Sequence, residues 1–181
     1  MLDKLLSAVQ ALRVGDPRDP ATDVGPMIDR LKAEEAYRKV QEAVKQGARA
    51  LLGGTLEENM FAPTILVDTT PAMRVNREEV FAPVITIIPY EDFPEAIKIA
   101  NTGEYGLQVG IFTQNLNRSM RAFGEMNVGG VIVNDIPTFR ADQMPYGGVK
   151  GSGLGREGPR FAIEEMTGLR LMVINREGGA E

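Results

Sequence analysis

The sequence contains neither cysteine nor histidine among its 181 residues. Without cysteine there is no disulfide framework, no thiolate nucleophile and no cysteine-based metal site. Without histidine the chain also lacks the commonest general base and the commonest metal ligand of proteins. Carboxylates, lysines, tyrosines and hydroxyls remain, so these absences disfavour catalysis by this chain alone without excluding it. We expect no metal site.

The sequence also lacks long apolar runs and blocks of like charge. Its longest apolar runs, such as Val84–Pro89, are far too short to span a membrane. The 20 basic and 25 acidic residues are interspersed, which gives a net charge of −5 and no basic face that would favour nucleic acid. The first 16 residues lack the apolar core and cleavage site of a signal peptide. We therefore predict a soluble, cytoplasmic protein that binds neither nucleic acid nor a membrane.

Helical and strand patterns alternate along the chain, whose length suits one domain with a sizeable core. Apolar spacing predicts helices over residues 2–12, 28–46, 93–101, 116–126 and 159–166. Short apolar runs predict strands over residues 48–52, 61–67, 84–89, 106–113, 131–133 and 169–174. This alternation predicts an α/β fold with a mostly parallel sheet flanked by helices.

Local chemistry sets several of the predicted helix ends. A side-chain oxygen just before a helix can accept a hydrogen bond from its first turn. The candidate caps of this kind are Asp23 or Asp29 for the helix over 28–46, Asp92 and Asn115. Gly47 is predicted to end the helix over 28–46. The residues predicted to face inward include Leu31 and Val40 of that helix and Leu116, Met120 and Phe123 of a later one.

Residues 131–158, VIVNDIPTFRADQMPYGGVKGSGLGREG, form the stretch around which the rest of the chain is interpreted. A buried strand at Val131–Val133 is followed by a long loop with six glycines, at positions 147, 148, 151, 153, 155 and 158. A loop this long inside a compact domain is more often functional than filler. Glycines let its backbone take positive φ values or pass close to another chain or a ligand. We predict that this loop lines a substrate entrance.

Three local patterns have plain explanations beside functional ones. Residues 153–158 match G-x-G-x-x-G, but the strand that a dinucleotide site needs directly before it is missing, so a chance match is favoured. Arg140 can form a surface ion pair with Asp142, or it can bind an anionic group of a substrate. Glu78 and Glu79 are adjacent, so only one can face a given ligand, and composition favours a solvated acidic turn.

Five stretches, in this order, resemble the carboxy-terminal part of the aldehyde dehydrogenase superfamily. They are VGDPRDPATDVGPMI from Val14, FAPTIL from Phe61, REEVFAPVITI from Arg77, NTGEYGLQVGIFT from Asn101 and VNDIPTFRADQMPYGGVKGSGLGREG from Val133. The segments MPYGGVK and IEEMT most closely resemble those of the branch that contains lactaldehyde dehydrogenases. The resemblance implies that residues 1–181 are part of a catalytic domain and that the cofactor-binding domain is absent from this sequence.

The resemblance also implies a reaction. In that family a cysteine thiolate attacks an aldehyde, a hydride passes to NAD or NADP, and a glutamate-activated water releases the carboxylic acid. The cysteine and the glutamate base lie upstream of the region that this chain resembles. The cofactor would be bound mainly by the missing domain, and the substrate would be a small aldehyde. We therefore expect the chain to be inactive alone.

The resemblance also implies roles for individual residues of this sequence that match functional positions of the family. Glu79 matches a glutamate that bonds the ribose beside the nicotinamide, and Phe81 an aromatic residue near the nicotinamide. Asn134 matches a structural anchor at a strand end. Tyr146 and, approximately, Phe139 match aromatic positions that line the substrate tunnel, and our working hypothesis is that Arg140 selects the aldehyde together with them. Glu157 matches a glutamate that can support proton transfer together with the general base.

Two further expectations concern the end of the chain. Gly168 stands where many relatives have a glutamate that braces the arginine matched by Arg156, so Glu164 or Glu165 would have to replace that brace. Residues 169–175 match a strand that joins subunits, which predicts a homo-oligomer. Two other functions stay open: a non-catalytic interaction module that pairs with full-length subunits, and a small-molecule-binding α/β domain suggested by the glycine loop.

Overall fold

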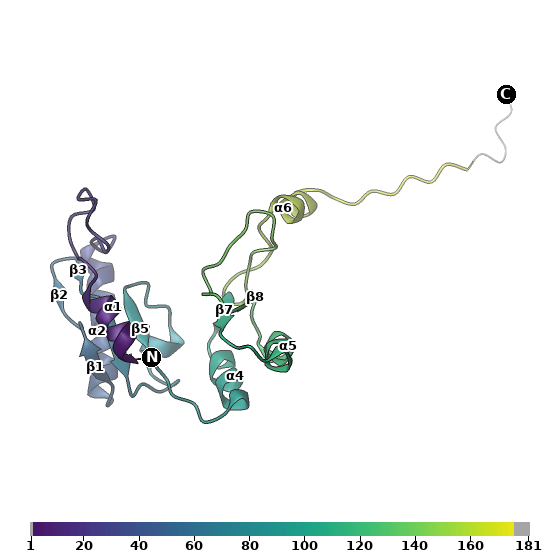
Figure 1. Cartoon of the computed structure of the whole chain (residues 1–181). Coiled ribbons are helices and arrows are strands. Elements are labelled where there is room, and N and C mark those ends of the chain that lie inside the picture. The colour runs from purple at the N-terminus through teal and green to yellow at the C-terminus, as the bar shows by residue number, and fades with distance from the viewer. Residues whose placement is uncertain (1, 176–181) are drawn as a thin grey trace. The chain divides into compact units, whose positions relative to one another are not determined.

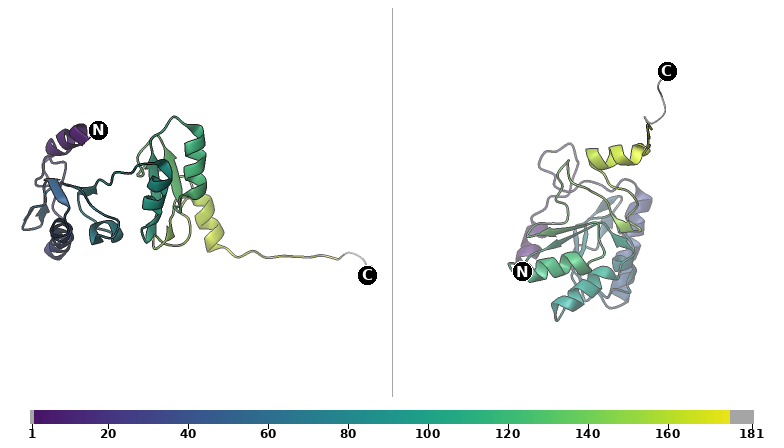
Figure 2. Two further views of the ribbon diagram at one scale, coloured as in Figure 1. Left: turned by 90° about the horizontal axis from the view of Figure 1, so that it is seen from below. Right: turned by 90° about the vertical axis from the view of Figure 1, so that its right-hand side faces the viewer.

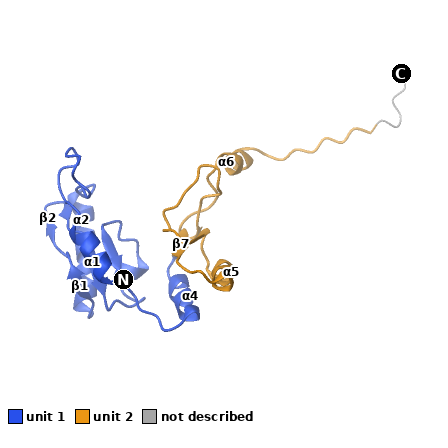
Figure 3. Ribbon diagram, viewed as in Figure 1, with its two compact units in different colours: residues 1–104 blue, residues 105–181 orange. Residues whose placement is uncertain are grey.

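The computed structural model describes residues 2–175 and divides the chain into two compact units, residues 1–104 and 105–181 (Figure 3). Helices and short strands alternate in both units (Figure 1), and two further views are given in Figure 2. The α/β class predicted from the sequence is confirmed. Within the described residues the strands form four small sheets with both parallel and antiparallel pairs, rather than one mostly parallel sheet.

The first unit is built around helix α2 (Arg30–Lys45) and a three-stranded sheet. The sheet has the order β1 (Arg49–Leu52), β4 (Thr64–Val67), β5 (Val84–Thr86); β4 pairs antiparallel with β1 and parallel with β5. The remaining elements of this unit are α1 (Leu2–Gln10), the hairpin of β2 (Leu56–Glu57) and β3 (Met60–Phe61), α3 (Arg74–Arg77) and α4 (Phe93–Asn101). Its buried core joins small residues of α2 to Phe61, Leu66, Met73 and Val75.

Helix α2 shows how local sequence fixes an element. The side chain of Asp29 accepts a hydrogen bond from the backbone N–H of Lys32 at 2.7 Å, and Gly47 follows the helix with φ of +109°, as predicted for both ends. The buried face matches the prediction only in part, since Val40 is fully buried as expected. Leu31 is 75% exposed, whereas Lys39 is only 4% exposed. A charged side chain therefore lies inside the apolar face of α2.

The second unit has two small sheets. Strand β7 (Gln108–Ile111) pairs parallel with β8 (Gly130–Val133), and β6 (Tyr105–Gly106) pairs antiparallel with β9 (Val149–Lys150). Helices α5 (Leu116–Glu125) and α6 (Pro159–Met166) complete it. Asn115 caps α5, as predicted, and Asp92 caps α4 in the first unit. The start of β8 lies directly against the glycine loop at Gly129. Only glycine fits there, because a Cβ atom would overlap the carbonyl oxygen of Gly147.

Two further structural predictions are wrong for this single chain. Leu116, Met120 and Phe123 were predicted to face inward, but all three are exposed, and Ala122 is the buried residue of α5. The strand predicted over residues 169–174 is absent, and these apolar residues are exposed and without regular secondary structure. A strand needs hydrogen-bonding partners on a neighbour, which local sequence does not supply.

None of the helices among residues 2–175 is both long enough and apolar enough to cross a bilayer. The cytoplasmic location stays a prediction.

Candidate functional site

Glu79 and Phe81 line one hollow in the first unit. They follow α3 in a short segment without regular structure. The hollow has a volume of about 510 Å³ and is lined by Pro26, Met27, Ile28, Lys32, Glu35, Glu79, Val80 and Phe81. Phe81 has φ of +50° and is 82% exposed. A bulky residue rarely adopts this backbone conformation, and such strained residues gather at functional sites.

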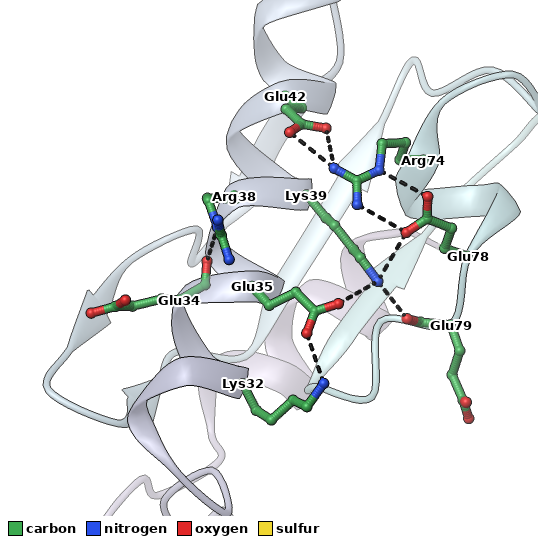
Figure 4. A network of polar contacts seen from close by, with 9 residues as sticks. All are labelled: Lys32, Glu34, Glu35, Arg38, Lys39, Glu42, Arg74, Glu78 and Glu79. Carbon is green, nitrogen blue, oxygen red and sulfur yellow. Dashed lines mark hydrogen bonds and ion pairs between the residues drawn. The ribbon is translucent and has the colours of Figure 1, made fainter.

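The backbone at Glu79 is held by Lys39. The Lys39 ammonium group donates a hydrogen bond to the Glu79 carbonyl oxygen at 2.8 Å. It also lies 3.3 Å from a Glu78 carboxylate oxygen and 3.5 Å from one of Glu35. Figure 4 shows all three contacts converging on the lysine nitrogen, while the side chain of Glu79 extends away from the cluster. The buried lysine therefore fixes the main chain and leaves the Glu79 carboxylate directed elsewhere.

Glu78, the neighbour of Glu79, belongs to a charge cluster instead. Arg74 binds it through two hydrogen bonds, of 2.9 and 3.0 Å, and contacts Glu42 at 3.0 Å (Figure 4). The hydrogen bonds from Arg74 lower the pKa of Glu78 to about 2, and those contacts raise the pKa of Arg74. Glu78 is therefore ionised at neutral pH. As predicted for adjacent residues, only Glu79 of the pair lines the hollow.

Three predicted site residues meet in the second unit. Tyr146 and Glu157 form an isolated antiparallel bridge, in which the Glu157 N–H donates to the Tyr146 carbonyl at 2.6 Å and the Tyr146 N–H donates back at 3.2 Å. Arg140 lies 2.6 Å from the Glu157 carboxylate, and its guanidinium carbon is 4.4 Å from the centre of the Tyr146 ring. Ion pairing and cation–π attraction thus hold Arg140 between the two. Its partner is Glu157 rather than Asp142.

Phe139 and Asn134 have different positions. Phe139 is half exposed, and its carbonyl oxygen accepts a hydrogen bond of 3.2 Å from the side chain of Gln108, so its main chain is fixed rather than its ring. Asn134, at φ of +60°, accepts a hydrogen bond from the Thr113 N–H at 2.8 Å. Its own N–H bonds Ile111 at 2.7 Å. Asn134 therefore anchors the end of β8 to the chain after β7, as the resemblance implies.

The glycine loop surrounds a second hollow, of about 520 Å³, in the second unit. Its lining includes Tyr146, Arg156, Glu157 and Glu165 together with several glycines. The Arg156 guanidinium donates to the carbonyl oxygens of Gly148 at 2.9 Å and Gly155 at 2.7 Å. These bonds tie together two parts of the loop. A Cβ atom on Gly147 would lie 2.5 Å from the Gly155 oxygen, so glycine is needed at this crossing.

Three residues that position these segments were not singled out by the sequence as site residues. Lys39 has a signal in retrospect, because it falls on the same helix face as Ala36 and Ala43. Glu165 was considered only as a replacement brace. Gln108 has no signal that spacing could provide. Among residues 2–175 no group of three or more acidic side chains is placed to hold a metal ion.

Comparison with known proteins gives a consistent result. Residues 1–172 match the aldehyde dehydrogenase family. The chain is 47% identical over 174 residues to 3-sulfolactaldehyde dehydrogenase from Priestia aryabhattai, covering 96% of this chain and 36% of that protein.

Two solved structures are similarly close. Aldehyde dehydrogenase 21 from Physcomitrella patens, in complex with the reaction product succinate, is 40% identical with a TM-score of 0.94, covering 99% of this chain and 37% of that one. Glyceraldehyde-3-phosphate dehydrogenase from Methanocaldococcus jannaschii, complexed with NADP, is 44% identical with a TM-score of 0.87, covering 91% and 36%. The chain thus spans little more than a third of the length of these relatives.

Proposed function

Because this chain belongs to the aldehyde dehydrogenase family, we propose that it forms the carboxy-terminal part of the catalytic domain of an NAD(P)+-dependent enzyme that oxidises an aldehyde to a carboxylic acid. The observation that carries the proposal is the grouping of the predicted residues. Glu79 and Phe81 line one hollow, and Arg140, Tyr146 and Glu157 form one cluster. Two surfaces with different chemistry suit the two reactants of such an enzyme.

Glu79 and Phe81 are proposed to contact the nicotinamide end of NAD(P)+, which supplies the hydride acceptor when bound. The Glu79 carboxylate can accept hydrogen bonds from ribose hydroxyls, because Lys39 binds its carbonyl oxygen and not its side chain. The exposed Phe81 ring offers a flat apolar face to the nicotinamide. These features fit the cofactor, although most of the binding surface is expected from polypeptide outside this sequence.

Arg140 is proposed to bind an anionic group on the aldehyde, with Tyr146 and Phe139 shaping the entrance. A guanidinium stacked on an aromatic ring presents its remaining N–H groups in a fixed fork that suits carboxylate, sulfonate or phosphate oxygens. The similar proteins are named for 3-sulfolactaldehyde and glyceraldehyde 3-phosphate, and one contains succinate. All three compounds carry such a group. The proposed substrate is therefore a small anionic aldehyde.

Glu157 is proposed to support proton transfer at the same site. Its side chain is 63% exposed beside Arg140, so water reaches the carboxylate. The chain has no cysteine, and the cysteine nucleophile is proposed to come from polypeptide outside this sequence. We therefore propose that the chain is inactive by itself.

The proposal can be tested in a graft enzyme, in which residues of this chain replace the matching 174 residues of the Priestia aryabhattai 3-sulfolactaldehyde dehydrogenase. The expected result is formation of NAD(P)H that depends on added aldehyde. Glu79→Gln in the graft enzyme should raise KM for the cofactor or lower kcat by about tenfold, because a bond between a carboxylate and a hydroxyl is weakened. The matched control is Glu91→Gln, an exposed carboxylate that does not line the hollow. Equal kinetics for both variants would remove Glu79 from the cofactor site.

A second candidate function is an interaction module that pairs with full-length subunits. It is favoured by the exposed apolar residues Leu169, Leu171 and Val173, whose backbone has no regular pairing in this chain. The same segment would join copies of a homo-oligomer. Co-purification of the chain with the full-length Priestia aryabhattai protein, abolished by deleting residues 169–175, would support pairing. Retention after the deletion would contradict it.

A further inference from the structure

Glu165 makes a contact that the proposed reaction has not yet used. It lies in the last turn of α6, and one carboxylate oxygen accepts a hydrogen bond from the backbone N–H of Arg156 at 2.9 Å. The two residues are nine positions apart, so this bond closes the glycine loop back onto the helix that follows it. A carboxylate that accepts a backbone N–H forms one of the stronger hydrogen bonds in proteins.

The position of this carboxylate is unfavourable for the helix itself. A negative charge near a helix C-terminus is opposed by the helix dipole, and α6 has no basic residue in its last turn to offset it. Gly155 is adapted to the contact. A Cβ atom there would lie 2.7 and 2.8 Å from the two Glu165 oxygens, and its φ is +77°. The Glu165 carboxylate therefore packs directly against the backbone of Gly155.

The contact is adjacent in sequence to the cluster of Arg140, Tyr146 and Glu157. Arg156 immediately precedes Glu157, which is bonded in both directions to the backbone of Tyr146 and pairs with Arg140. The side chain of Arg156 donates to Gly148 and Gly155 on either side of the same crossing. Fixing the Arg156 N–H therefore restricts the peptide from which the Glu157 carboxylate extends.

We propose that Glu165 is a positioning residue that fixes the Arg156–Glu157 backbone and so sets the orientation of Glu157 and Tyr146 toward the aldehyde. The second part of this inference rests on the proposed function. Of the two glutamates considered as braces, Glu165 takes the role, but it binds the main chain of Arg156 rather than its guanidinium. Glu164 instead lies 3.0 Å from Arg160 in an exposed pair. Glu164 is thus a matched control of equal charge, one residue away.

The first test uses the chain as it is and needs no activity. Amide hydrogen exchange at Arg156 should be about tenfold faster in Glu165→Ala than in the unchanged chain, because the acceptor is removed. Glu165→Gln should keep slow exchange, since its amide oxygen can still accept the bond. Glu164→Ala should have no effect. Equal exchange rates of the Arg156 amide in Glu165→Ala and Glu164→Ala would overturn the contact. If Glu165→Ala fails to fold, fast exchange of the Arg156 amide in a folded Glu165→Gln would overturn it instead.

The second test uses the graft enzyme. Glu165→Ala should lower kcat/KM for the aldehyde by about tenfold while KM for NAD(P)+ changes by less than about twofold, and Glu165→Gln should restore most of the loss. If Glu165 had only a general structural role, Glu165→Ala would change the kinetic constants for both the aldehyde and NAD(P)+, and Glu165→Gln would not restore them. A graft enzyme without any activity would count against the proposed function. The exchange result would still decide whether Glu165 holds the backbone N–H of Arg156. Wild-type kinetics in Glu165→Ala would overturn the positioning role.

Discussion

The Glu79–Phe81 segment and the Tyr146–Gly158 loop are held in place by different kinds of contact. The first is fixed by one buried side chain, Lys39, whose ammonium group donates a hydrogen bond to the backbone carbonyl of Glu79. The second is fixed by backbone hydrogen bonds, by glycines packed against carbonyl groups and by an exposed ion pair. The first arrangement depends on a single polar group in the core. The second depends on backbone hydrogen bonds, on glycines that allow a close approach, and on the Arg156 and Glu165 side chains that bind the loop backbone.

This difference predicts where each segment is vulnerable. A buried charge whose partners remain after it is removed leaves those partners unsatisfied. A glycine in a backbone crossing cannot accept even one methyl group without moving the chain. Exposed pairs contribute little to stability, although they can fix a side chain for binding. The proposed cofactor segment should therefore tolerate surface changes, and the proposed substrate loop should not tolerate new Cβ atoms.

The largest expected effect is from Gly129→Ala. The added methyl group would overlap the Gly147 carbonyl oxygen, so β8 and the loop cannot keep their present approach. We expect the second unit to lose about 3 kcal/mol of unfolding free energy, measured by urea unfolding and by hydrogen exchange of that unit. The control is Gly124→Ala in α5, where a Cβ meets nothing within 4 Å. This change should leave stability unchanged or raise it slightly, and equal losses in both variants would contradict the account.

The next effect is expected from Lys39→Met. Methionine preserves much of the apolar stem but leaves the Glu79 carbonyl without its donor, so the unfolding free energy should fall by about 2 kcal/mol. Hydrogen exchange should also increase in the Glu79–Phe81 segment and not in the glycine loop. Lys32→Met, at an exposed position of the same helix, should leave the unfolding free energy nearly unchanged. A Lys39→Met chain as stable as the unchanged one would show that the buried lysine is not an anchor.

A smaller effect concerns pH. The pKa of Glu78 is about 2 in the folded chain against 4.5 ordinarily, mainly because Arg74 donates hydrogen bonds to it. Between these values the unfolded chain binds the proton and the folded chain does not. The stabilisation is therefore complete above about pH 4.5 and is lost as the pH falls toward 2.

The pH effect can be isolated by substitution. Arg74→Gln should flatten the loss of unfolding free energy over this range, measured by urea unfolding at a series of pH values. Arg77→Gln, whose pairing distance to Glu104 is 3.9 Å, is the control and should keep the original slope. An unchanged slope in Arg74→Gln would place the acid sensitivity elsewhere.

The smallest effect on stability is expected from Arg140→Gln. Its ion pair with Glu157 is about half exposed, so the unfolding free energy should change by less than about 0.5 kcal/mol. In the graft enzyme the same change should raise KM for an anionic aldehyde by about tenfold or more and barely affect an uncharged aldehyde of similar size. Equal effects on both aldehydes would remove Arg140 as the anion-binding residue.

Much of the fold could be predicted from the sequence because its signals are local. Asp29, Asp92 and Asn115 cap helices as expected, since a cap depends only on the residues of one turn. Burial was less predictable. Leu31 and the α5 residues Leu116 and Met120 are exposed, because which face is covered depends on neighbours far away in sequence. The strand expected over 169–174 likewise requires a partner.

The candidate site was predicted in type but not in arrangement. The resemblance singled out Glu157, and the residues of the long loop singled out Arg140. Their 17-residue separation gave no reason to pair them, and the pairing accompanies the Tyr146–Glu157 bridge. Lys39 and Gln108 bind backbone carbonyls, and such contacts leave no spacing pattern that a sequence can reveal. Positioning residues are therefore the part of the site that is visible only in three dimensions.

The central proposal is that this chain supplies cofactor-binding and substrate-binding residues of an aldehyde dehydrogenase whose nucleophile lies outside this sequence. The most direct measurement is aldehyde-dependent formation of NAD(P)H by the purified chain alone and by the graft enzyme, under the same conditions. We predict no turnover by the chain and clear turnover by the graft enzyme. Turnover by the chain alone, or a correctly folded graft enzyme that binds cofactor and remains inactive, would contradict the claim.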